Sequence, residues 1–121
     1  MQPRIRDILR DARRASDYIA VTIEGVTLER YVLDEDLRSI VERKLIVVGE
    51  VLVRVRQNDP TTYGLIEDAR AAIALRNIIV HDYNNIDDSR VFLIVQELLP
   101  ILRATLDALL DDESPDQPGD S

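Results

Sequence analysis

The chain has 121 residues, a formal net charge of −8 and no cysteine. A chain of this length forms one domain with its own core but is too short for two, and without cysteine it has no disulfides or thiolate metal sites, so we expect a reducing, cytoplasmic setting. We expect no membrane association, because no apolar run approaches the roughly 20 residues needed to span a bilayer and the first residues lack the apolar block of a signal peptide.

Periodic apolar residues predict a first helix over residues 4–22, followed by one short helical turn. Steps of three and four place these residues on one face, while most arginines of the segment fall on other faces. Residues 24–26 include a glycine and end the helix, and Thr27 can cap a short turn over residues 28–32. The apolar stripe consists of Ile5, Ile8, Leu9, Ala12 and Ile19.

The longest predicted helix follows, with Asp34 or Asp36 as its N-cap and Gln57 near its end. Its apolar surface is wider than one stripe, which is typical of a helix that packs on two neighbours or on a second chain. Gly49 lies in the middle, where glycine costs about 1 kcal/mol relative to alanine and permits a close backbone approach. The inward stripe is Leu37, Val41, Leu45, Val48, Leu52 and Val55, and it is widened by Ile40, Ile46, Val47, Val51 and Val53.

Residues 58–62 contain a proline and predict a stop and a loop. A third helix is expected from about Leu65 to the segment 83–85, and a fourth over residues 89–110, bent at Pro100. The inward residues are Ile66, Ala69, Ile73 and Val80 on the third helix, and Val91, Ile94, Val95, Leu98, Leu102, Leu106 and Leu109 on the fourth. The predicted fold is therefore all-α, a bundle of four main helices with one short extra helix.

The acidic excess is concentrated at the end of the chain. Residues 111–121 contribute −5 and leave −3 for residues 1–110. Interleaved proline, glycine and serine predict that residues 111–121 form a disordered acidic tail after a single domain over residues 1–110. The nearly neutral domain can carry a local basic patch, but it is not expected to coat nucleic acid generally.

One segment, residues 76–83, contains residue types that suit the binding and cleavage of a phosphodiester. It contains Arg76, the only histidine of the chain at His81, and Tyr83. An arginine suits phosphate oxygens, and a histidine changes its charge near neutral pH, so the pair can bind and cleave a phosphodiester without a metal. On an ideal helix Arg76 and His81 lie about 140° apart, whereas Arg76 aligns with Tyr83 and Asn77 aligns with His81. Either the helix ends or distorts between Ile79 and His81, or the Arg76 and His81 that act together come from two chains, which suits a symmetric dimer.

Each residue also has a structural interpretation. His81 can interact with the carbonyls at a helix end, Arg76 can form a surface ion pair, and Tyr83 can be a half-buried anchor. Spacing alone does not decide between these interpretations and a site.

The wider sequence resembles a known family. Residues 76–83 match the Arg-x4-His-x-Tyr motif of the HEPN superfamily, and the chain is similar to the HepT-like toxins of that superfamily. The likeness spans about residues 4–110 in order and spacing. It includes residues 8–12, 40–43, 48–50, 75–77 and 98–102. Val51 departs from the alanine that is frequent in the family, and the acidic tail has no clear counterpart.

The resemblance implies a HEPN-type bundle that forms a symmetric homodimer and acts as a metal-independent endoribonuclease without a cofactor. It assigns catalytic roles to Arg76, His81 and Asn77. It also implies that a minimal nucleotidyltransferase antitoxin similar to MntA silences the toxin by transferring AMP from ATP onto Tyr83. An anionic adenylyl group beside Arg76 would then occupy the phosphate site.

Two other hypotheses assign the chain to functional classes other than a metal-independent ribonuclease. The chain can be a non-catalytic HEPN module that binds a nucleotide or a nucleotidyltransferase partner. It can also be a bundle with a carboxylate-bridged metal, but Ile78 stands three residues before His81, so the Glu-x-x-His ligand pair of such bundles is missing.

Overall fold

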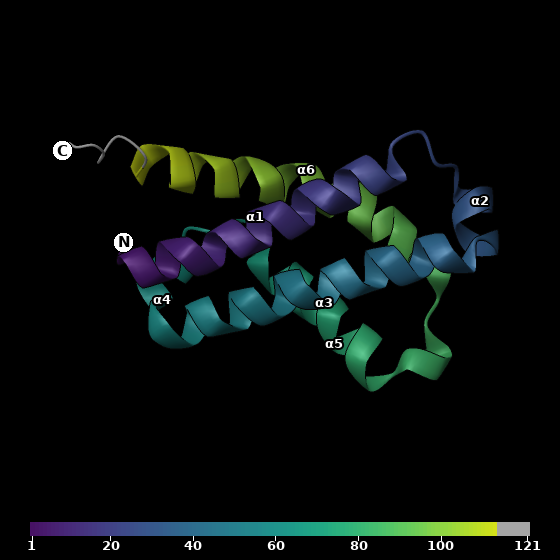
Figure 1. Cartoon of the computed structure of the whole chain (residues 1–121). Coiled ribbons are helices and arrows are strands. Elements are labelled where there is room, and N and C mark those ends of the chain that lie inside the picture. Colours follow the sequence, from purple (N-terminus) through teal and green to yellow (C-terminus); the bar gives the residue numbers. More distant parts are fainter. Residues whose placement is uncertain (114–121) are drawn as a thin grey trace.

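The computed structural model describes residues 1–113, and all the elements in this range are helices. The four long helices are α1 (Pro3–Ile23), α3 (Glu35–Asn58), α5 (Ala69–His81) and α6 (Asp88–Glu113). Short helices α2 (Leu28–Leu33) and α4 (Pro60–Tyr63) and a 3-10 turn, η1 (Tyr83–Asn85), connect them. Figure 1 shows α1 and α3 running side by side in opposite directions. The predicted all-α bundle with four main helices is confirmed.

The predicted glycine break and caps explain how α1 ends and how α2 and α3 begin. Gly25 follows α1 with a φ of +74°, a conformation that glycine adopts without a steric penalty. The Thr27 hydroxyl then accepts a hydrogen bond of 3.1 Å from the Arg30 N–H at the start of α2. Of the two candidate caps for α3, it is Asp34 that acts, since its carboxylate accepts from the Leu37 N–H at 3.0 Å.

The predicted loop over residues 58–62 is partly wrong, because Pro60–Tyr63 form a short helix that the sequence reading missed. Asp59 caps this helix, accepting from both the backbone N–H and the hydroxyl of Thr62. These two hydrogen bonds hold the pKa of Asp59 below its usual value. Asp at the N-cap followed by Pro at the first helical position is a common start of a helix. The segment is too short to show an apolar periodicity, so the helix was not predicted.

The predicted bounds of the third helix are wrong at both ends. Residues 64–68 are turns, and Asp68 has a left-handed φ of +68°, so α5 begins at Ala69 rather than near Leu65. At the other end, Asp82 has φ −137° and ψ 40°, so the α-helix stops at His81. Val80, which was expected to face inward, is 40% exposed.

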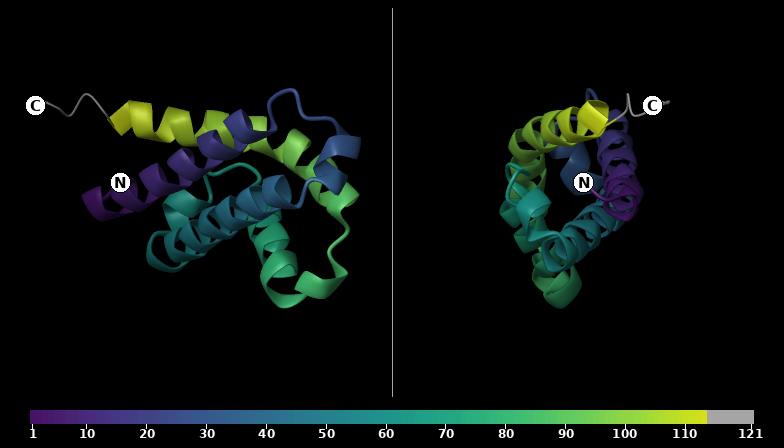
Figure 2. Two further views of the ribbon diagram at one scale, coloured as in Figure 1. Left: turned by 45° about the vertical axis from the view of Figure 1, so that its right-hand side comes forward. Right: turned by 90° about the vertical axis from the view of Figure 1, so that its left-hand side faces the viewer.

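The fourth helix is longer than predicted. α6 runs through Pro100 to Glu113, and Figure 2 shows that it changes direction along its length. The first residues assigned to the acidic tail, 111–113, therefore belong to α6. The rest of the predicted tail, residues 114–121, lies outside the described residues.

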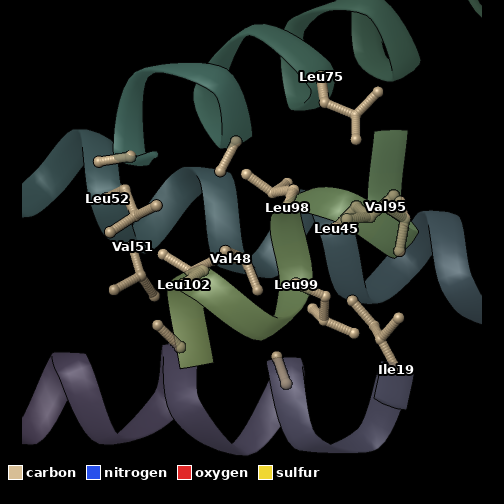
Figure 3. Close-up of a cluster of buried hydrophobic side chains, with 14 of the residues drawn as sticks. Ile19, Leu45, Val48, Val51, Leu52, Leu75, Val95, Leu98, Leu99 and Leu102 are labelled. Atoms are coloured by element: carbon tan, nitrogen blue, oxygen red, sulfur yellow. The ribbon is translucent and has the colours of Figure 1, made fainter. Parts of the chain in front are cut away.

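The core lies between the four long helices, and α3 packs against both α1 and α5. Figure 3 shows side chains from α1, α3, α5 and α6 meeting there, with Leu52 of α3 and Leu102 of α6 fully buried or nearly so. The predicted inward stripe of α3 is buried at every position, while Ile94 and Leu109 of α6 are only partly buried. Among residues 1–113, no helix is both long and apolar enough to cross a bilayer.

Candidate active site

Arg76 lies where α5 crosses closest to α3. A Cβ atom built on Gly49 would stand 2.3 Å from the Cβ atom of Arg76 and 2.6 Å from its Cγ atom, distances that no side chain tolerates. Glycine at position 49 therefore allows the stem of Arg76 to pack directly on the backbone of α3. The expected close approach at Gly49 is confirmed, and its partner is the arginine of the motif.

The guanidinium of Arg76 is held by two hydrogen bonds. Nη1 donates to Oδ1 of Asn77 at 2.8 Å, and Nη2 donates to Oε2 of Glu50 at 3.5 Å. The Arg76 side chain is only 22% exposed, and its buried Nε has no hydrogen-bond partner among residues 1–113. The guanidinium is therefore oriented rather than free to rotate, an arrangement that suits an arginine for binding an oxyanion.

His81 occupies the last position of α5, and its side chain is exposed. The α-helix continues through Ile79 and Val80 to His81, so the alternative in which it ends or distorts between Ile79 and His81 is wrong. Arg76 packs on α3, whereas His81 and Asn77, one turn apart, share the outward face of α5. Because Asn77 binds the guanidinium, it links the inward-packed Arg76 to the face that carries His81.

The predicted alignment of Tyr83 with Arg76 is wrong. It assumed a continuous helix, but the chain leaves the α conformation at Asp82 and forms η1. Tyr83 is 61% exposed, so it is not the half-buried anchor either. Figure 2 shows the end of α5 and η1 projecting from the body of the bundle, which places the motif tyrosine on a protruding tip.

Tyr83 lines a small hollow of about 190 Å³ together with Arg38 and Asp88. The Nε atom of Arg38 lies 3.3 Å from Oδ2 of Asp88, and its Nη1 donates to the carbonyls of Tyr31 and Val32. Arg38 thereby ties the end of α2 to the start of α6, beside the loop that carries Tyr83.

A buried carboxyl forms the floor of the same region. Glu42 is 7% exposed, and burial, followed by the nearby charge of Asp88, raises its pKa while Arg38 offsets part of the shift. Burial also raises the pKa of Tyr31, whose hydroxyl has no partner among the described residues and whose ring stacks on Phe92 at 4.8 Å.

Sequence reasoning missed Glu50 as a residue of the site. Its pairing with Arg76, 26 residues away, depends on how α5 crosses α3, which no local pattern predicts. A glycine followed by an acidic residue in mid-helix is the one signal that pointed there. Within residues 1–113, no three histidine or acidic side chains are grouped so that they could hold a metal ion.

One family model, described as ribonuclease HepT-like, matches residues 5–109. The match includes all four long helices apart from the outermost residues of α1 and α6, and it includes the whole segment 76–83. No curated protein and no solved structure gives a significant match.

Proposed function

Because the chain belongs to the HepT-like ribonuclease family, we propose that it is a metal-independent endoribonuclease that acts as the toxin of a toxin–antitoxin pair. The observation that carries the proposal is the arrangement of Arg76, Asn77 and His81. A guanidinium held in place by Asn77 lies next to the helix face that presents the only histidine of the chain.

The site is proposed to be completed by a second copy of the chain. The outward face of α5 carries Asn77 and His81, and the apolar side chains of Ile78 and Val80, on either side of this face, are 46% and 40% exposed. Exposed apolar side chains grouped around polar site residues favour an interface over a solvated surface. A twofold axis at the protruding end of α5 would bring two copies of His81 together.

Two histidines in one cleft supply the base and the acid of the reaction. One neutral imidazole takes the proton of the ribose 2′-hydroxyl, and the 2′-oxygen attacks the adjacent phosphorus. The bond from phosphorus to the 5′-oxygen breaks, and the protonated imidazole of the partner subunit gives its proton to that leaving oxygen. The products are a 2′,3′-cyclic phosphate and a 5′-hydroxyl, and the two histidines exchange protonation states.

Arg76 stabilises the charge that grows on the phosphoryl oxygens. Its contact with Asn77 keeps the guanidinium oriented. Charge-assisted hydrogen bonds to an oxyanion are stronger than hydrogen bonds between neutral groups. Asn77 acts as a positioning residue, because a carboxamide neither gives up nor takes up a proton near neutral pH and acts only through its hydrogen bonds.

The purified, unmodified protein is expected to cleave a single-stranded RNA in the presence of a metal chelator. The same sequence made of DNA should remain intact, since it lacks the attacking 2′-hydroxyl. Gel electrophoresis and mass spectrometry of the products would detect the cyclic phosphate ends. Protein that binds a nucleotide or a nucleotidyltransferase but cuts no RNA would instead support the non-catalytic HEPN module.

Regulation by adenylylation is also part of the proposal. Tyr83 is exposed on the protruding tip, two residues after His81, so its hydroxyl is open to a nucleotidyltransferase antitoxin. Transfer of AMP would add a bulky anion close to the proposed cleft and repel RNA. This physical reason replaces the direct occupation of the Arg76 site, which required the two residues to share a helix face.

Incubation with ATP and the cognate antitoxin is expected to add whole adenylyl units to the protein, measured by intact mass. The variant Tyr83→Phe should gain none. Tyr18→Phe is the matched control, because Tyr18 is exposed to a similar extent, 52% against 61%, and this variant should be modified fully. Unchanged labelling of Tyr83→Phe would contradict the assignment.

A further inference from the structure

A groove runs between α1 and α3, on a different side of α3 from the crossing with α5. It has a volume of about 580 Å³, and a second hollow of about 440 Å³ adjoins it, since Arg14 and Tyr18 line both. We call the two together the α1/α3 groove. Its lining includes Arg14, Tyr18, Lys44, Glu50, Val51 and Arg54.

The charges of this groove leave two cations uncompensated. Each acidic residue that lines it has an arginine partner within 3.5 Å. Lys44 and Arg54, in contrast, have no carboxylate within 4.0 Å among the side chains of residues 1–111. The paired residues are Asp11 with Arg14, Asp17 with Arg103, and Glu50 with Arg76. In a protein with a net charge of −8, two unpaired cations in one groove indicate an anionic ligand.

An aromatic ring stands between the two hollows. Tyr18 is 52% exposed, and the Lys44 ammonium lies over its ring at 4.6 Å from the centroid. Val21, 73% exposed, extends the second hollow beyond Tyr18. A half-exposed ring flanked by cations and apolar surface can stack on a nucleobase while the cations contact the phosphates beside it.

The groove leads to the candidate active site. Lys44, Val51 and Arg54 share one face of α3, because they are spaced by seven and three residues. Glu50 lies at the edge of that face and reaches the guanidinium of Arg76 at 3.5 Å. Glu50 therefore joins the groove to the proposed phosphate-binding arginine, and a strand that leaves the groove past Glu50 reaches the site on the α5 side of α3.

We propose that the α1/α3 groove binds the single-stranded RNA that flanks the scissile bond. Lys44 and Arg54 contact successive phosphates, and Tyr18 stacks on an unpaired base. The strand must be single, because a base in a duplex has both faces covered by its neighbours and cannot stack on Tyr18. The inference rests on the proposed ribonuclease function and adds a substrate path to it.

The test measures binding of a fluorescently labelled single-stranded RNA by anisotropy, with all variants made in full-length protein carrying His81→Ala to prevent cleavage. The double change Lys44→Gln with Arg54→Gln is expected to raise the Kd at least about tenfold. It should also reduce the slope of log affinity against log salt by about 1.4, since each phosphate contact on a single strand contributes about 0.7. Tyr18→Leu is expected to raise the Kd about tenfold without changing the salt slope.

The matched control removes the same charge elsewhere. Arg4→Gln with Arg30→Gln changes two exposed arginines outside the groove and should leave the Kd within about twofold of the parent. Equal losses of affinity in the groove and control variants, or no loss in either, would contradict RNA binding in the groove. Cleavage of RNA by the wild-type protein would still support the ribonuclease function in that case. If the wild-type protein neither binds nor cuts RNA, the proposed function fails, and the groove fails with it. Circular dichroism of each variant would verify that these surface changes leave the helices intact.

Discussion

Replacing His81 by alanine is expected to reduce RNA cleavage at least about 100-fold, because a positioned general acid or base contributes roughly 10²–10⁴-fold to a rate. The chain has no second histidine that could take over this role. The imidazole is exposed at the end of α5 and is not part of the core, so the thermal unfolding midpoint should stay close to that of the wild type. Single-turnover cleavage rates and thermal unfolding, measured on the same samples, test both parts of this expectation.

Gln96→Ala is the matched control, since it also truncates an exposed side chain at a helical position but lies on α6. It should retain full activity. A His81→Ala protein that cleaves RNA at the wild-type rate would remove the histidine from the mechanism and favour the non-catalytic module.

Mixed dimers show whether two copies of His81 act together. If one histidine is the base and its partner the acid, a dimer with one His81→Ala subunit is inactive. After free exchange of subunits, activity then falls as the square of the wild-type fraction. A linear fall would mean that each subunit cuts RNA alone, which contradicts the shared cleft.

Replacing Gly49 by alanine is expected to damage both the fold and the site. The new methyl group would stand 2.3 Å from the Cβ of Arg76, which is fixed to the backbone of α5 and cannot swing away. Overpacking of this kind costs typically about 1–3 kcal/mol, and the better helix propensity of alanine offsets up to about 1 kcal/mol of it. Because the clash is with a Cβ atom and not with the flexible end of a side chain, the cost should lie near the upper end of this range. We therefore expect a net loss of about 2 kcal/mol in the free energy of unfolding, measured by urea denaturation.

The same change should lower the cleavage rate at least about tenfold, because α5 must move away from α3 and the guanidinium of Arg76 moves with it. Gly64→Ala is the control. A Cβ at Gly64 would meet its nearest neighbours at an ordinary 3.5 Å, so both stability and activity should be nearly unchanged. Equal stability of Gly49→Ala and the wild type would contradict the close crossing of α3 and α5 at Gly49.

The long helices could be predicted from the sequence because each is amphipathic over many turns, and such a pattern has one low-energy solution, a helix with its apolar stripe turned inward. The caps Thr27 and Asp34 were predictable for a similar reason, since a capping hydrogen bond joins residues only three positions apart. The motif residues could also be selected from the sequence, because their spacing and types resemble those of a family.

The end of α5 illustrates what local patterns do not decide. The predicted helix continued to residues 83–85, since nothing in the sequence of Asp82 and Tyr83 forbids it. In the structure the chain turns away at Asp82 and packs Ile86 against the core, and this tertiary contact moves Tyr83 off the helix face of Arg76. The competing conformations are close in local energy, so packing elsewhere selects one of them.

Periodicity and side-chain type were enough to predict an all-α bundle, the capped starts of α2 and α3, and the residues proposed to cleave a phosphodiester. The packing of Arg76 on Gly49, the hydrogen bond from the guanidinium to Glu50 and the lack of carboxylate partners for Lys44 and Arg54 among the described side chains follow from the tertiary structure alone. These properties arise where helices distant in sequence cross, and the angle and distance of a crossing are set by the packing of all the helices together.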